Sequence, residues 1–168
     1  MAVSLNTYVD GYLKGLTTLE HLLERGLAFA KEQGVSEAEM LEWRLAPDMF
    51  NLRQQVMTVA SFTNQWVARA MGDPDPAPFE GEPGLAELRA RIAQTRAFLQ
   101  GLEPGKLDAR ADEPLTADLG VVSPTLPVAQ WVTGFLTTNF YFHLSMAYAI
   151  LRNRGVPLGK RDLFAGGL

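Results

Sequence analysis

The stretch WVTGFLTTNFYFHLSMAYAILRNR, from Trp131 to Arg154, decides the fold. Its apolar residues return every three or four positions, the spacing that places side chains on one face of an α-helix. No proline interrupts it, so we predict a last long helix over about residues 128–153. The stripe predicted to face the core comprises Val132, Phe135, Leu136, Phe142, Met146 and Ile150.

Two polar residues, Asn139 and His143, interrupt this stripe. They stand four positions apart, so on a helix they lie on the same face, one turn from each other, and we expect both to reach inward. A buried amide or imidazole needs a hydrogen-bond partner, because leaving it unpaired costs about 1–3 kcal/mol. This pair is therefore the starting point for any candidate site.

Three other segments share the helical spacing, over about residues 5–31, 48–71 and 85–99. The second of them also carries a polar residue, Gln55, on its apolar stripe, which comprises Leu52, Gln55, Val59, Phe62 and Trp66. Ser36 followed by Glu39 is typical of a capping box and predicts a short extra helix over residues 37–43.

Periodicity is lost over residues 104–127, where proline and glycine recur. We expect a long loop there, or a small hairpin that involves the run over residues 115–119. The predicted fold is all-α: an antiparallel four-helix bundle with this loop or small hairpin before the last helix.

Length and composition indicate one globular domain over residues 1–168, with 47% hydrophobic and 20% charged residues. The 19 acidic and 15 basic residues give a net charge of -4, which disfavours a nucleic-acid partner. No apolar run approaches the ~20 residues of a membrane span. The absence of cysteine and of a signal-peptide pattern leads us to expect a soluble, cytoplasmic protein.

Several motifs resemble an uncharacterised bacterial domain family of the DinB/YfiT-like superfamily. They are LAPDMF (Leu45–Phe50), LRARI (Leu88–Ile92), NFYFH (Asn139–His143), AYAILR (Ala147–Arg152) and GVPLGKRD (Gly155–Asp162). The resemblance spans nearly the whole chain. It implies a four-helix bundle in which many members bind a divalent metal through three histidines, one on the second long helix and two spaced by four on the last.

Carried onto this chain, the three positions of the superfamily's metal site fall on Asn139, His143 and Gln55, of which only His143 is a histidine. Amide oxygens are much weaker ligands for zinc than imidazole or carboxylate. The second histidine, His21, lies at the margin of the first predicted helix. The resemblance thus implies a degenerate metal site, with a hydrogen-bonded Asn/His/Gln cluster in place of the ion.

Three interpretations of Gln55, Asn139 and His143 stay open: a structural polar network, a pocket for a small ligand, or a divalent-metal site with Zn or Ni. The first two fit a non-catalytic or small-ligand-binding protein without a cofactor. The third fits a metal-dependent enzyme that resembles the thiol-dependent transferases of the superfamily. The aromatic residues of the helices predict core packing, a pocket or a homodimer face.

Overall fold

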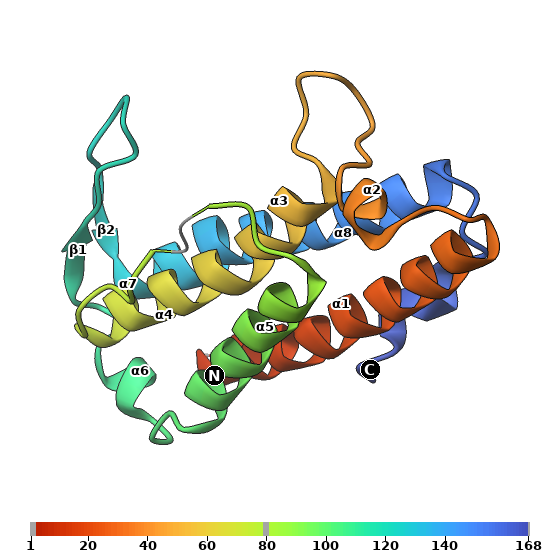
Figure 1. The fold of residues 1–168 in the computed structure, drawn as a ribbon. Coiled ribbons are helices and arrows are strands. Elements are labelled where there is room, and N and C mark those ends of the chain that lie inside the picture. Colours follow the sequence, from red (N-terminus) through yellow and green to blue (C-terminus); the bar gives the residue numbers. More distant parts are fainter. Residues whose placement is uncertain (1–2, 79–80, 168) are drawn as a thin grey trace.

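Long helical segments carry most of the chain in the computed structural model, which describes residues 3–78 and 81–167 (Figure 1). They pack side by side, with the two-stranded hairpin at one end and the last short helix lying along α1. The elements are, in order, α1 (Asn6–Glu32), α2 (Glu37–Leu41), α3 (Leu52–Met57), η1 (Thr58–Phe62), α4 (Thr63–Met71), α5 (Leu85–Gln100), α6 (Lys106–Ala109), β1 (Pro114–Thr116), β2 (Thr125–Pro127), α7 (Val128–Gln130), η2 (Trp131–Leu136), α8 (Thr137–Asn153) and η3 (Lys160–Phe164). The fold is mostly helical, as predicted, and of the loop or small hairpin expected before the last helix the structure has the hairpin.

Side-chain caps set two of the helix starts. Ser36 and Glu39 form the predicted capping box at α2. The second long helix begins at Leu52, whereas the sequence predicted a start at about residue 48. The reason is a second capping box, in which the Asn51 side chain accepts from the backbone N–H of Gln54 at 2.9 Å while the Gln54 side chain accepts from the N–H of Asn51. The residues before it form a loop that projects from the bundle (Figure 1).

Two of the long segments contain a π-helical turn, η1 and η2. A hydroxyl group from a neighbouring helix donates to a carbonyl inside each turn. Thr95 of α5 donates to Ala60 O of η1 at 3.1 Å, and Tyr12 of α1 donates to Val132 O of η2 at 3.1 Å. Contacts between helices therefore satisfy backbone groups in both turns.

The π turn η2 rotates the rest of the last helix relative to the predicted stripe. A π turn holds one residue more than an α turn, so every later side chain is displaced by about 100° around the axis. Phe142, predicted to be buried, is 52% exposed for this reason. The face that is buried after the turn comprises Phe140, Leu144, Ala147, Ile150 and Leu151.

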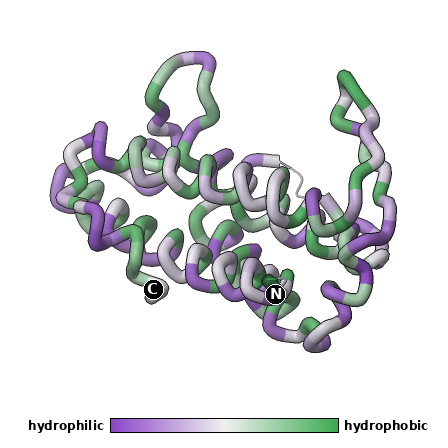
Figure 2. Tube along the Cα trace, turned by 180° about the vertical axis from the view of Figure 1, so that it is seen from behind, coloured by the Kyte–Doolittle hydropathy of each residue, from purple (hydrophilic) through white to green (hydrophobic). Residues whose placement is uncertain are grey.

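The hairpin of β1 and β2 stands out from the end of the bundle where α7 begins (Figure 1). Leu115 pairs with Leu126, and the hydroxyls of Thr116 and Thr125 lie 2.7 Å apart across the strands. The apolar tip of the hairpin is green in Figure 2, and Val121 in it is 91% exposed.

One hydrophobic core runs from Leu5 of the N-terminal segment to Leu158 beyond α8. Trp66 is buried in it, as its place on the predicted stripe indicates, and Trp131 and Phe140 are buried there too. Among the described residues, none of the helices is long and apolar enough to cross a lipid bilayer.

Candidate functional site

Gln55 and His143 meet between α3 and α8. Gln55 is 2% exposed, and its Oε1 lies 2.7 Å from Nδ1 of His143. Its Nε2 donates to the carbonyl oxygen of Phe50 at 3.3 Å. The amide is thus held at both ends, and it fixes the imidazole against the side of α3.

This arrangement selects one tautomer of His143. Because the Gln55 amide nitrogen is turned toward Phe50, its oxygen faces the imidazole. An amide oxygen can only accept, so Nδ1 carries the proton and Nε2 carries the lone pair of the neutral ring. Nε2 is therefore the atom of the pair that can accept a hydrogen bond from a ligand or coordinate an ion.

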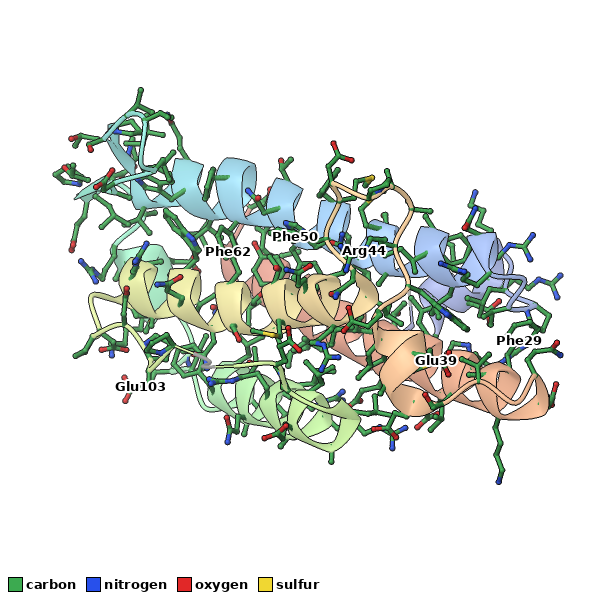
Figure 3. All side chains as sticks on the ribbon, turned by 45° about the horizontal axis from the view of Figure 1, so that its top comes forward. Phe29, Glu39, Arg44, Phe50, Phe62 and Glu103 are labelled. Carbon is green, nitrogen blue, oxygen red and sulfur yellow. The ribbon has the colours of Figure 1, made fainter. Side chains whose placement is uncertain are left out.

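Two phenylalanine rings flank the imidazole. The Phe50 ring stacks on it with a centroid distance of 6.0 Å, and the Phe142 ring meets it edge-on at 5.1 Å. Figure 3 shows Phe50 beside the seam between α3 and α8. Phe50 was not predicted as part of the site, although it closes the LAPDMF motif five residues before Gln55.

Burial lowers the pKa of the His143 imidazole, because desolvation disfavours its charged form. The unfolded chain takes up this proton near the ordinary pKa of about 6.5, and the folded chain takes it up only at lower pH. Above the unfolded-state pKa of about 6.5, His143 therefore leaves the free energy of unfolding unchanged. As the pH falls from there toward the lowered pKa of the folded chain, His143 decreases the free energy of unfolding increasingly.

We expect a His143→Gln variant to remove this pH dependence, since glutamine does not titrate. Between pH 7.5 and pH 5 the wild-type chain should lose more free energy of unfolding than the variant. Urea unfolding followed by circular dichroism at several pH values measures both. The other titratable groups are common to both chains, so equal losses would contradict a depressed His143 pKa.

Asn139 lies apart from this pair. Its Nδ2 donates to the carbonyl oxygen of Phe135 in its own helix at 2.8 Å. Its side chain is half-buried and lines a groove between η2 and the hairpin. The structure therefore brings together two of the three predicted site residues and turns the third toward the hairpin.

The second histidine takes part in another interaction. His21 Nε2 lies 2.7 Å from Oδ1 of Asp162 in η3, and this contact lowers the pKa of the Asp162 carboxyl. Over residues 3–78 and 81–167, no group of three or more His, Cys, Asp or Glu side chains is placed to hold a metal ion. His21 thus does not replace a missing ligand at His143.

The comparisons with known proteins place the chain in a family. A model of the family described as a domain of unknown function (DUF1993) matches residues 5–164. The chain belongs to the DUF1993 family. The DUF1993 chain is also similar to a crystal structure of a DinB family member protein from Shewanella denitrificans, with 30% identity and a TM-score of 0.83. The match covers 96% of this chain and 95% of that one, and no curated protein matches.

The family match and the structural neighbour confirm the predicted resemblance: an uncharacterised domain with a DinB-like fold. In this DUF1993 chain the candidate site is the hydrogen-bonded pair of Gln55 and His143, whose imidazole contacts two phenylalanine rings.

Proposed function

We propose that this DUF1993 chain is an antiparallel four-helix bundle of the DinB/YfiT-like type that binds a small molecule and carries out no metal-dependent chemistry. The observation that supports this most directly is the 2.7 Å contact between Gln55 Oε1 and His143 Nδ1. It places a hydrogen-bonded pair where the resemblance implies a metal ion.

The side chains at this position do not fit the three-histidine site of the superfamily. They offer one imidazole and two amides, and amides bind zinc weakly. Gln55 gives its oxygen to His143, and Asn139 gives its amide N–H group to Phe135. An ion on Nε2 of His143 would leave the Gln55–His143 hydrogen bond intact and would have a single imidazole as its ligand, whereas coordination by Gln55 Oε1 would break that bond.

The alternative is a divalent-metal-dependent enzyme resembling the thiol-dependent transferases of the superfamily. Here His143 would supply Nε2 as a single imidazole ligand for Zn or Ni. Such an enzyme would need Gln55 and Asn139 to coordinate through their amide oxygens.

Metal content separates the two functions. We expect purified wild-type protein, dialysed against Zn²⁺ or Ni²⁺ and then against buffer, to hold far less than one equivalent of metal by elemental analysis. A Gln55→His variant places a second imidazole beside His143 and serves as a positive control, with an expected gain in bound metal over the wild type. Near-stoichiometric metal in the wild type, lost in His143→Ala, would favour the enzyme.

Self-association is part of the same proposal. Tyr141 and Phe142 are adjacent aromatic residues of α8 that are 45% and 52% exposed. Large apolar side chains that are exposed side by side favour a surface that a partner covers. A homodimer through this face is therefore the expected partner, and the acidic net charge of -4 disfavours nucleic acid. A cytoplasmic location stays a prediction from the sequence.

A further inference from the structure

A groove between η2 and the hairpin has the dimensions of a small-molecule site. Its volume is about 570 Å³, within the ~300–1,000 Å³ that is usual for ligand pockets. Its lining includes Leu119 and Leu126 from the hairpin and Trp131, Gly134, Phe135 and Asn139 from the last helix. All the side chains of the described residues that line it are uncharged.

The wall of the groove is held rigid by aromatic packing. The Trp131 ring lies 4.9 Å from that of Trp66 and meets Phe135 edge-on at 5.4 Å. Its indole N–H donates to Leu115 O of β1 at 2.8 Å, which joins the helix to the hairpin. A preformed wall of this kind loses little conformational entropy when a ligand binds.

Gly134 leaves the floor of the groove open. A Cβ built on Gly134 would have no atom within 4 Å, so close packing does not require glycine there. Its φ is not positive, so the backbone does not require glycine either. Glycine inside a helix lowers stability by about 0.5–1 kcal/mol relative to alanine. Because glycine has no side chain, its presence here leaves the floor of the groove open.

Asn139 supplies a directed polar group at the edge of the groove. Because its Nδ2 is bound to Phe135 O, its Oδ1 is the atom that can accept from a ligand. The absence of charge in the lining disfavours an ionic ligand, which would be desolvated without a counter-charge.

We propose that this groove binds an uncharged, planar, apolar molecule that carries one N–H or O–H donor, with the donor on Asn139 Oδ1 and the ring over Gly134. This inference rests on the proposed small-ligand function and assigns it a place and a ligand class. The site is separate from the Gln55–His143 pair.

The test uses indole and benzothiophene, two bicyclic probes of similar shape of which only indole has an N–H donor. Binding is measured by titration with ¹H–¹⁵N NMR detection. We expect indole to bind the wild type about 3- to 10-fold more tightly than benzothiophene, because one hydrogen bond contributes a difference of this size to the affinity. An Asn139→Leu variant should lose this preference and still bind both probes.

A Gly134→Phe variant places a ring in the groove, since its Cβ would meet no atom within 4 Å, and should weaken indole binding by about tenfold or more. Ala90→Phe, which adds the same ring at an exposed position of α5 outside the groove, is the matched control and should bind indole as the wild type does. Thermal unfolding of each variant checks that it is folded.

Any of four outcomes would overturn the groove as the binding site. The first is indole binding that Gly134→Phe leaves unchanged. The second is that neither probe changes the NMR chemical shifts of the wild type. The third is a dimer that Gly134→Phe dissociates while indole still binds, which would make the groove a contact between copies. Shifts centred on Phe50 and His143 would move the ligand to that pair, so the groove would be wrong while the proposed function stood.

Discussion

Trp131→Ala is expected to lower the free energy of unfolding by about 3–5 kcal/mol, the range for removing a buried tryptophan. The side chain is 1% exposed and packs against Trp66 and Phe135. It also joins the last helix to the hairpin through its bond to Leu115. The loss combines a cavity in the core with the loss of this link.

Urea unfolding followed by circular dichroism measures the effect, and Trp131→Phe separates its two parts. Phenylalanine keeps most of the apolar volume and removes the N–H donor, so we expect a smaller loss that includes about 1 kcal/mol for the hydrogen bond. If Trp131→Ala itself is too unstable to purify, the phenylalanine variant still reports on the link. A loss below about 1 kcal/mol for Trp131→Ala would contradict its place in the core.

Gly15→Leu is expected to cost about 3 kcal/mol, because α1 and α8 approach closely at this point. A Cβ on Gly15 would overlap the ring of Phe140, which is itself buried. The leucine can fit only if the two helices move apart or Phe140 leaves its place. The free energy of unfolding from urea titration measures the cost.

Gly134→Leu is the matched control, since it makes the same change inside a helical segment with open space around the new Cβ. Leucine is the better helix former, so this variant should gain up to about 1 kcal/mol. Equal losses in both variants would contradict the close approach of α1 and α8, because they would reflect the substitution and not its surroundings.

The local signals in the sequence predicted the helices well. The capping residues Ser36 and Glu39 act where they stand, and the third long helix begins at Leu85 as predicted. These signals are local: each depends on a few neighbouring residues that contact one another in almost any fold. Gln55 was also predicted to be buried, because its stripe belongs to a face that packs on the core.

The direction of the last helix's side chains could not be predicted in the same way. Nothing in the spacing of Trp131 to Leu136 distinguishes a π turn from an α turn, and yet that one extra residue exposes Phe142. It also leaves Asn139 and His143 half-buried, with Asn139 beside the hairpin. The hydroxyl of Tyr12, which binds Val132 O in this turn, lies 120 positions away in the sequence.

The sequence by itself determined the long helical segments, their order and the polar residues that interrupt the apolar stripes, and it left a loop or a hairpin open before the last helix. Only the tertiary structure decided which of those polar residues meet. Gln55 and His143 come together across 88 positions because α3 and α8 pack, and Asn139 joins a different surface because it lies one helical turn nearer the hairpin. The reason is physical: helix formation is governed by nearby residues, whereas the angle at which a helix presents its side chains depends on the neighbours that pack against it.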